Sequence, residues 1–343
     1  MKIIHLADLH IGSKFDHFPE DIKSDLNSKL RNAFLDIIKY ANTNKIDTII
    51  MSGDIFDKNT VLIKDKKFFY DSIKSYPDID FYYIRGNHDL SSKYEENILN
   101  LHTFDGISSY TKKNVKIIGY ELSDNNDVLY NYSPFTSDKF NIMMLHGDIN
   151  NSRDNNYIDL KRLEDKNIDY FALGHIHKRS NGMINNSKYA YPGCVMGRGF
   201  DELGKKGFLV LDTEKNDTEF INIPSNEFEN VEINITNKNE VGIKNLISQF
   251  LKEKNSNITE IKLIGKTDLE IDTIDLNNTF KDYRYYLIIK NESKLKLNYS
   301  INEKENSLKN MFINKVLENK DLDEETKELV INYGLSKLIK EEE

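Results

Sequence analysis

Five short polar segments within the first 177 residues of this chain each follow a run of apolar residues, and no other feature constrains the fold as strongly. The segments read ADLH at 7–10, GDIFD at 53–57, GNHD at 86–89, HGD at 146–148 and GHIH at 174–177. Each preceding run, such as KIIHL or FYYIR, has the length and apolar content of a buried strand. Ligand sites in α/β folds form at the carboxyl ends of strands, so we expect the five segments to converge in space.

The first half of the chain alternates between strands and helices. Strands are predicted at 2–7, 47–51, 81–85, 115–120, 140–145, 169–173 and 207–212, and helices at 22–42 and 62–75. The alternation predicts an α/β core. Few helices separate the later strands, which therefore indicate a second sheet packed on the first.

The pattern changes after a polar segment at 223–226, which indicates a domain boundary. Beyond it we predict a small α+β domain with strands at 231–237 and 258–265, helices at 240–254 and 275–282, and a hairpin formed by YYLIIK and LKLNYS. Residues 304–340 have the apolar spacing of two amphipathic helices. The predicted parts are therefore 1–225, 226–302 and 303–343.

Charge and cysteine content limit the classes of function. The net charge is -9, whereas a protein that holds nucleic acid by its own basic surface is usually positive. The single cysteine, Cys194, excludes a disulfide within the chain and fits a reducing compartment. His5 and Asp8 interrupt the first apolar run, so we expect no signal peptide. No stretch approaches the ~18 apolar residues that cross a membrane. These features predict a soluble, cytoplasmic protein with no membrane partner.

The residue types in the five segments indicate a metal centre. Asp and His together suit divalent transition ions such as Mn²⁺, Fe²⁺ or Zn²⁺, and the amide oxygen of Asn favours the harder ions among them. Asp-x-His and His-x-His place two side chains on one side of an extended segment. Seven candidate ligands are too many for one ion and match two ions that share a carboxylate. They are Asp8, His10, Asp54, Asn87, His146, His175 and His177.

Each segment also has a simpler explanation when it is taken alone. Gly-Asp and Asn-His-Asp are common in turns, and His-Ile-His fits a surface strand. His5 lies within the first predicted strand and fits a core histidine whose hydrogen bonds are satisfied. The order of the five segments, each after a strand, favours the metal centre over these explanations.

Together the segments resemble the signature of the calcineurin-like metallophosphoesterase superfamily. LADLHIGS, and GHIHK followed by YPGCVMGRGFDELGKKGF, are similar to its DNA-repair exonuclease subfamily, the SbcD-like nuclease subunits. The resemblance covers about two-thirds of the chain. It implies a four-layer α/β fold, a β-sandwich flanked by helices, followed by a cap domain that selects substrate. Cys194 departs from the Ser or Asn common in this pattern, and Asp57 stands where some nucleases of the family have His.

The resemblance also implies a role for each candidate ligand. One ion would be held by Asp8, His10, Asp54 and His177, and the other by Asp54, Asn87, His146 and His175. Mn²⁺ is the first expectation, with Fe²⁺, Mg²⁺ and Zn²⁺ as alternatives. Two such ions clamp the scissile phosphate and generate hydroxide near neutral pH.

Four further residues receive expectations from the same resemblance. His88 would donate a proton or a charged hydrogen bond to the leaving oxygen, and Asp89 would orient its ring. Asp57 and Arg198 are candidate substrate contacts. For Arg198, an ion pair with Glu202 four residues on is a nearly equal alternative.

The implied function is a two-metal DNA phosphodiesterase, an exonuclease or endonuclease of DNA repair and recombination. It would act as a homodimer with an SbcC-type ATPase docked on 303–343, although these helices fit packing on the chain's own core equally well. A cyclic-nucleotide or other small-substrate phosphodiesterase stays open. A phosphoprotein phosphatase is disfavoured, because IFDK and GNHD stand where that family has DRG and GNHE. The intact ligand set argues against a third alternative, a non-catalytic DNA-binding or scaffold subunit.

Overall fold

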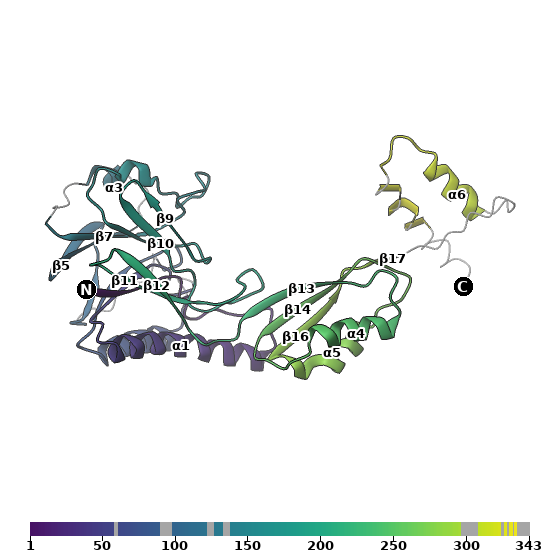
Figure 1. The fold of residues 1–343 in the computed structure, drawn as a ribbon, viewed down its shortest axis with the longest axis horizontal. Helices are drawn as coiled ribbons and strands as arrows, with labels where there is room; N and C mark the ends of the chain where they lie inside the picture. Colours follow the sequence, from purple (N-terminus) through teal and green to yellow (C-terminus); the bar gives the residue numbers. More distant parts are fainter. Residues whose placement is uncertain are drawn as a thin grey trace. The chain divides into compact units, whose positions relative to one another are not determined.

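The computed structural model describes residues 1–57, 61–89, 98–121, 127–132, 138–295 and 308–323, with further positions between 326 and 334. The chain forms two compact units, Met1–Phe228 and Glu229–Glu343 (Figure 1). No helix within these described ranges is long and apolar enough to cross a membrane.

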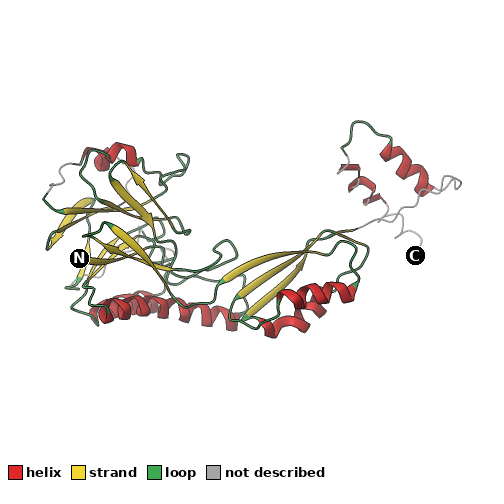
Figure 2. Cartoon of the chain, viewed as in Figure 1, coloured by secondary structure: helices red, strands yellow, loops and turns green. Residues whose placement is uncertain are grey.

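The first unit contains two six-stranded sheets (Figure 2). The first sheet has the order β12-β11-β1-β2-β3-β4, formed by β1 (Lys2–Leu6), β2 (Thr48–Ser52), β3 (Asp80–Ile84), β4 (Leu101–Thr103), β11 (Gly207–Asp212) and β12 (Asp217–Asn222). The second has the order β5-β6-β7-β8-β10-β9, formed by β5 (Ile107–Lys112), β6 (Val115–Tyr120), β7 (Phe140–His146), β8 (Tyr170–Gly174), β9 (Ser180–Ile184) and β10 (Ser187–Tyr191). Strands β1 to β4 are parallel, and so are β6, β7, β8 and β10.

Alternating side chains on these strands build two apolar layers. In β7, Ile142 and Met144 enter the core between the sheets, while Met143 and Leu145 lie on the opposite face. Both faces of the sheet are therefore buried, which explains why the parallel strands read as continuous apolar runs.

Helices cover the outer faces of the two sheets. On the first sheet lie α1 (Glu20–Thr43) and α2 (Ile63–Lys74), where Phe34 stacks on Phe69 at 5.2 Å between ring centroids. On the second lie α3 (Asp127–Asn131) and the short 3₁₀ helix η1 (Leu160–Leu163). The expected four-layer α/β sandwich is confirmed. Strands β4, β5, β9, β10 and β12 were not predicted, because they are short or carry mostly polar side chains.

The second unit is a small α+β fold. Its sheet, in the order β13-β14-β16, comprises β13 (Phe228–Asn234), β14 (Ile258–Ile264) and β16 (Tyr286–Asn291). Helices α4 (Glu240–Phe250) and α5 (Thr273–Phe280), followed by the 3₁₀ turn η2 (Lys281–Tyr283), share one apolar core with this sheet. Further along the chain, α6 (Leu308–Leu317) forms a separate small cluster with Ile331.

The hairpin predicted from YYLIIK and LKLNYS stays a prediction, because 296–300 lies outside the described residues. Strand β16 pairs in parallel with β14, in a register that places Ile261 opposite Ile289. The start of the second segment, β17 (Lys294–Leu295), pairs in parallel with β15 (Lys266–Thr267). A parallel pair needs a crossover, here α5, and the local sequence pattern does not specify it.

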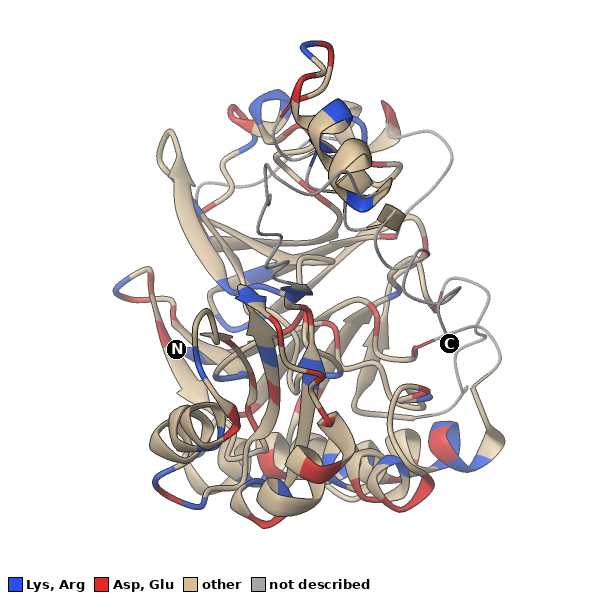
Figure 3. Cartoon of the chain, turned by 90° about the vertical axis from the view of Figure 1, so that its right-hand side faces the viewer, with Lys and Arg blue, Asp and Glu red and all other residues tan. Residues whose placement is uncertain are grey.

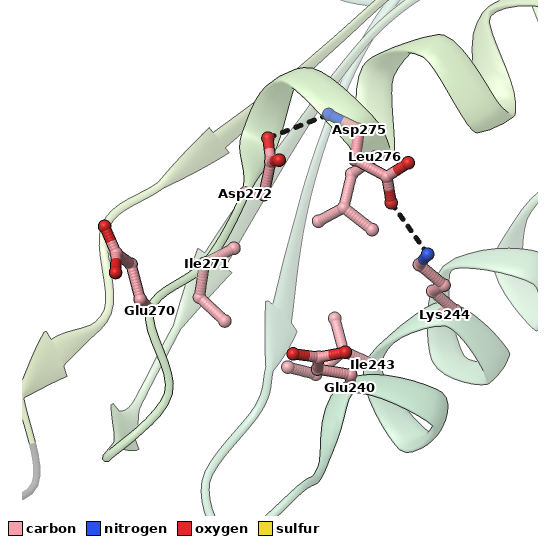
Figure 4. Close-up of a pocket in the computed structure, with 8 residues that line it drawn as sticks. All are labelled: Glu240, Ile243, Lys244, Glu270, Ile271, Asp272, Asp275 and Leu276. Carbon is pink, nitrogen blue, oxygen red and sulfur yellow. Dashed lines mark hydrogen bonds and ion pairs between the residues drawn. The ribbon is translucent and has the colours of Figure 1, made fainter.

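A pocket of about 240 Å³ lies between α4 and α5 (Figure 4). Ile243, Ile271 and Leu276 give it apolar walls, and four acidic residues and Lys244 line the rest. Asp272 caps α5 through the backbone N–H of Asp275 at 2.9 Å, and Lys244 pairs with the Asp275 carboxylate at 2.7 Å. Two of its four carboxylates therefore already have partners within the fold.

The first unit extends beyond residue 225, where the sequence suggested its end. The Asn226 side chain accepts a hydrogen bond from Lys29 Nζ at 2.6 Å. The Phe228 ring contacts the rings of Phe18 and Phe200, with centroids 5.9 and 5.5 Å away. These contacts tie the segment to the first unit up to Phe228.

Positive and negative side chains are intermixed along the chain. In the view of Figure 3, Lys and Arg alternate with Asp and Glu on the helices and loops. Any affinity for a phosphate substrate must therefore arise locally.

Candidate active site

The five polar segments lie at the carboxyl ends of five strands. Residues 7–10 follow β1, 53–57 follow β2 and 86–89 follow β3 in the first sheet. His146 ends β7, and 175–177 follow β8 in the second sheet. Contacts between β2 and both β7 and β8 bring the two sets of strand ends together. The predicted convergence is therefore present.

Tight backbone turns aim these side chains inward. Asp8, His10, Asp54 and His175 have φ of 52°, 50°, 52° and 97°. This left-handed region is uncommon for residues other than Gly and costs roughly 1–3 kcal/mol, so surrounding contacts must hold it. Two backbone hydrogen bonds do so for the first loop: Asp8 N–H donates to Gly53 O at 3.1 Å and His10 N–H to Asp54 O at 3.0 Å.

Two glycines allow the loops to approach this closely. A Cβ atom on Gly53 would lie 2.3 Å from His146 Nδ1, and one on Gly86 would lie 2.2 Å from Asp54 Oδ1. Both separations are far below van der Waals contact. The glycines in GDIFD and GNHD therefore make room for the side chains of their neighbours.

The converging side chains form two overlapping donor groups, and a further group of His10, Asp57 and His88 shares His10 with the first. Asp8, His10 and His177 each place one donor atom within 4.8 Å of the others, and so do Asp8, Asp54 and His146. Asn87 Oδ1 joins the second group, 3.0 Å from His146 Nε2 and 3.1 Å from His175 Nδ1.

Asp54 lies between the two groups. Its Oδ2 is 3.3 Å from His146 Nε2 and 3.8 Å from His10 Nε2. The same side chain is only 2% exposed, so solvent does little to compensate its charge. Asp54 therefore lies within reach of one histidine from each group, and Asp8 is a member of both.

Each histidine of the donor groups has an inner ring nitrogen, which faces the other donor atoms, and an outer one, which faces away. Three of these histidines use the outer nitrogen for a hydrogen bond that fixes the ring. His146 Nδ1 donates to the Ser52 carbonyl at 2.8 Å and His177 Nδ1 to Glu202 Oε1 at 2.7 Å. His175 Nε2 lies 3.5 Å from Asp154 Oδ2. A neutral imidazole that donates from one nitrogen carries a lone pair on the other. The inner nitrogens therefore present lone pairs to one another and to Asp54 and Asn87.

This donor set fits divalent metal ions. His10 Nε2 and His177 Nε2 are only 3.1 Å apart, and His10 Nδ1 is buried without a hydrogen-bond partner of good geometry, although Asp57 Oδ1 is 3.3 Å away. Facing lone pairs in a dry site repel each other unless a cation or a proton lies between them. An outer hydrogen bond that orients a ligating imidazole is common in metal sites.

The pKa values of His146 and Asp54 also indicate that a positive charge is favourable at this site. Burial alone would lower the pKa of His146, but the charge and hydrogen bond of Asp54 raise it to about 9. Burial alone would raise the pKa of Asp54, yet the neighbouring imidazole holds it well below its usual range. Without a metal, a proton on His146 supplies the missing charge.

His88 lies beside the donor groups, but Asp89 does not hold its ring as expected. The Asp57 carbonyl, and not Asp89, holds the His88 ring by accepting from Nδ1. The Asp89 carboxylate instead accepts from the N–H groups of Gly86 at 2.6 Å and Ile55 at 2.8 Å. Burial and the nearby Asp54 raise the pKa of Asp89 to about 6. The expectation that Asp89 orients His88 is corrected: Asp89 braces the loops after β2 and β3.

A family model for the calcineurin-like phosphoesterase superfamily domain matches residues 1–216. The chain belongs to this superfamily. It is therefore a metallophosphoesterase, a hydrolase whose fold implies divalent metal ions, in agreement with the donor groups above.

Two relatives of this metallophosphoesterase are informative. The uncharacterized metallophosphoesterase YhaO of Bacillus subtilis is 29% identical over 243 residues, which is 64% of this chain and 59% of YhaO. The DNA double-strand break repair protein Mre11 of Methanocaldococcus jannaschii is 27% identical over 265 residues, 69% of this chain and 70% of Mre11. The match thus spans less than two-thirds of the Bacillus protein.

Solved structures add a likeness of fold alone. A novel archaeal phosphodiesterase is 18% identical with a TM-score of 0.35, covering 65% of this chain and 100% of its own. A dimetal phosphatase from Danio rerio is 8% identical with a TM-score of 0.42, covering 61% and 91%. Likenesses at this level carry no argument about substrate.

Asp57 and Arg198, the candidate substrate contacts, lie beside each other. Arg198 Nη1 is 3.0 Å from Asp57 Oδ1, and Arg198 Nη2 is 2.7 Å from Glu202 Oε1. The ion pair that was weighed for Arg198 is therefore formed, together with a second one that the sequence did not indicate. Burial alone would raise the pKa of Glu202, but hydrogen bonds from His177 and Arg198 hold it well below its usual range.

The sequence did not reveal two residues at the rim of the site. Glu202 holds His177, and its spacing four residues after Arg198 was the available signal, understood only as a helical ion pair. Asp154 approaches His175 from a polar loop that gives no signal at all. His5, as expected, is a core residue: it is fully buried, with Nδ1 2.9 Å from the Tyr170 hydroxyl.

Proposed function

We propose that this metallophosphoesterase is a two-metal-dependent DNA phosphodiesterase of DNA repair. The observation that carries the proposal is the pair of donor groups linked by Asp8 and Asp54, with His88 beside them. The similarity to Mre11, named as a DNA double-strand break repair protein, supports DNA as the substrate.

The residues divide between two metal positions. Asp8, His10, Asp54 and His177 would hold one ion, and Asp54, Asn87, His146 and His175 the other. This mixed nitrogen and oxygen set suits Mn²⁺, with Fe²⁺, Mg²⁺ and Zn²⁺ as alternatives. When bound, such ions neutralise charge on the phosphate oxygens and supply a nucleophile near neutral pH.

His88 is the candidate general acid. Its Nδ1 is held by the Asp57 carbonyl and its backbone N–H donates to Asp54 Oδ1 at 2.9 Å, so both ring and backbone are fixed. Nε2 is then the atom that passes a proton to the leaving oxygen of the scissile phosphodiester. A positioned acid of this kind contributes roughly 10²–10⁴-fold to the rate.

The second unit would select the substrate and the partner. We assign residues 229–302 to a cap and 303–343 to the docking of an SbcC-type ATPase. Leu308 and Met311 of α6 are 72% and 62% exposed, while Ile313 is buried in its small cluster, and exposed apolar side chains favour a protein partner. The ATPase would supply the basic surface that a chain of net charge -9 lacks.

Two further assignments complete the proposal. The metallophosphoesterase would act as a homodimer in the cytoplasm. Its one cysteine, Cys194, is buried and free, which fits a compartment where disulfides are not needed.

The test is cleavage of end-labelled single- and double-stranded DNA with Mn²⁺. Wild type should degrade DNA, and His88→Ala should bind Mn²⁺ yet cleave about 10²–10⁴-fold more slowly. The matched control is His102→Ala, because His102 stacks on Tyr82 and contacts Asp80 away from the donor groups, and it should keep full activity. Unchanged cleavage by His88→Ala would remove the general-acid role.

A small-substrate phosphodiesterase, such as one for cyclic nucleotides, is the second candidate. The net charge of -9 and the intermixed charges of Figure 3 favour it, because both weaken affinity for a polyanion. Cleavage of bis-p-nitrophenyl phosphate with no cleavage of DNA, even with an ATPase partner present, would favour this candidate.

A further inference from the structure

The Arg198 guanidinium joins two carboxylates from distant parts of the chain. Its Nη1 is 3.0 Å from Asp57 Oδ1, while Nη2 and Nε are 2.7 and 3.2 Å from Glu202 Oε1. The Glu202 side chain is 5% exposed and that of Arg198 is 18% exposed. Because a guanidinium is planar with its donors in a rigid fork, it fixes the two carboxylates relative to each other.

Each of these carboxylates contacts the outer nitrogen of a different histidine. Glu202 Oε1 lies 2.7 Å from His177 Nδ1, and Asp57 Oδ1 lies 3.3 Å from His10 Nδ1. On the inner side, the Nε2 atoms of His10 and His177 are 3.1 Å apart. The contacts therefore form a closed ring: they run from His10 through Asp57 to Arg198, and from Arg198 through Glu202 to His177, which faces His10.

We propose that Arg198 is a positioning residue that aligns His10 through Asp57, and His177 both through Glu202 and through its own Nη2, 3.1 Å from His177 Nδ1, and so sets the affinity of one of the two metal positions. The inference rests on the proposed function, because that function assigns both histidines to one ion. It replaces the earlier expectation that Arg198 contacts the substrate phosphate.

The charges around Arg198 disfavour a phosphate contact. Asp57, Arg198 and Glu202 together carry two negative charges and one positive charge. All three guanidinium nitrogens already face carboxylate oxygens. A phosphate brought to this cluster would meet net negative charge and would have to displace charge-assisted hydrogen bonds, which are the strong ones.

The other metal position is oriented by different groups. His146 is held by the Ser52 carbonyl and His175 lies near Asp154. Arg198 contacts neither of these holding groups in the hydrogen bonds and ion pairs of the described residues. Loss of Arg198 should therefore weaken one ion selectively, whereas general damage to the fold would weaken both.

The experiment measures Mn²⁺ binding to full-length protein without substrate, following free Mn²⁺ by its EPR signal. The variants are Arg198→Met, which removes the charge, and Arg198→Lys, which keeps the charge but loses the fork. Wild type should bind two ions. In both variants one dissociation constant should rise about 10–100-fold, the usual effect of losing an outer partner of a metal ligand, while the other stays within about threefold.

Two controls sharpen the result. Arg31→Met removes another partly buried pair of the first unit, Arg31 with Asp65 at 3.1 Å, and should leave both Mn²⁺ affinities unchanged. Asp154→Ala should weaken the other ion instead. Circular dichroism and thermal unfolding of the metal-free variants establish that each is folded, and Glu202→Gln takes the place of Arg198→Met if that variant unfolds.

The outcomes separate the inference from the proposed function. Two unchanged Mn²⁺ affinities in Arg198→Lys and Arg198→Met would overturn the inference, and a raised KM for DNA in those variants would make Arg198 a phosphate contact. Equal weakening of both ions would also overturn it. A wild-type protein that binds no Mn²⁺ would instead overturn the proposed function.

Discussion

The two units of this metallophosphoesterase each contain an arginine paired with a glutamate, but with opposite consequences. In the second unit, Arg284 Nε donates to Glu229 Oε1 at 2.9 Å and to Thr259 Oγ1 at 3.1 Å, and Nη1 donates to the Glu253 carbonyl at 2.8 Å. All three acceptors belong to the second unit, and none of these contacts leads to a histidine. In the first unit the contacts of Arg198 continue to two histidines whose inner nitrogens face other acceptors.

The backbone differs in the same way. Four residues of the candidate site have positive φ, namely Asp8, His10, Asp54 and His175. Among the described residues of the second unit, Asn237 is the one residue other than glycine with positive φ, and Asn tolerates this conformation well. A satisfied polar cluster on relaxed backbone indicates a structural role, whereas converging acceptors on strained backbone indicate a ligand site.

The strongest test of this comparison is Asp54→Asn. The change removes the carboxylate that lies near one histidine of each donor group, and with it the charge that pairs with His146. We expect metal-dependent cleavage of bis-p-nitrophenyl phosphate to fall by more than about 100-fold, beyond the effect of losing an outer partner. Glu229→Gln is the matched change in the second unit and should leave the rate unchanged. Comparable rates for the two variants would contradict the assignment of a ligand site to the first unit and a structural cluster to the second.

When the metal is removed, the stability of the protein should depend on the protonation of His146. The folded-state pKa of His146 is about 9, above its unfolded value near 6.5. The stability that this imidazolium contributes is therefore fully present below pH 6.5 and is lost as pH rises through 9. We expect EDTA-treated protein to be less stable to urea at pH 9.5 than at pH 6.5, by an amount on the order of 1–3 kcal/mol.

Manganese should reverse this dependence, because Mn²⁺ needs a deprotonated imidazole. Stability with Mn²⁺ should therefore not fall between pH 6.5 and 9.5. A His146→Ala protein without metal should lose the pH effect that wild type shows. If the pH dependence of stability persists in His146→Ala, it must come from other titratable groups.

Arg284→Met should give the smallest effect of the series on the site. The variant leaves Glu229 and Thr259 without their shared donor, at a cost of about 1–3 kcal/mol in the free energy of unfolding. Mn²⁺ affinity and diester cleavage should match wild type. Urea unfolding and Mn²⁺ titration measure the two quantities, and altered metal binding would show that the second unit contributes to the metal site.

Much of the fold was predictable from the sequence, because its main signals are local. The apolar spacing of Leu30, Phe34, Ile37 and Ile38 predicted α1, and the apolar runs predicted most strands of the two sheets. Where these local signals failed to predict an element, the reason is also physical. The short strand β9 reads SNGMI, without the alternation of a strand, and the parallel pairing of β14 with β16 depends on segments far apart in the chain.

The sequence by itself determined which residues converge, because polar segments that follow parallel strands must meet at one edge of the sheets. The tertiary structure alone decided how each histidine is oriented. The Asp57 carbonyl holds His88, Glu202 holds His177, and Arg198 pairs with Asp57 across 141 positions of sequence. Sequence patterns report the period of a segment and its neighbours along the chain. A hydrogen bond across the site depends on where packing places two distant segments, and no local pattern encodes that distance.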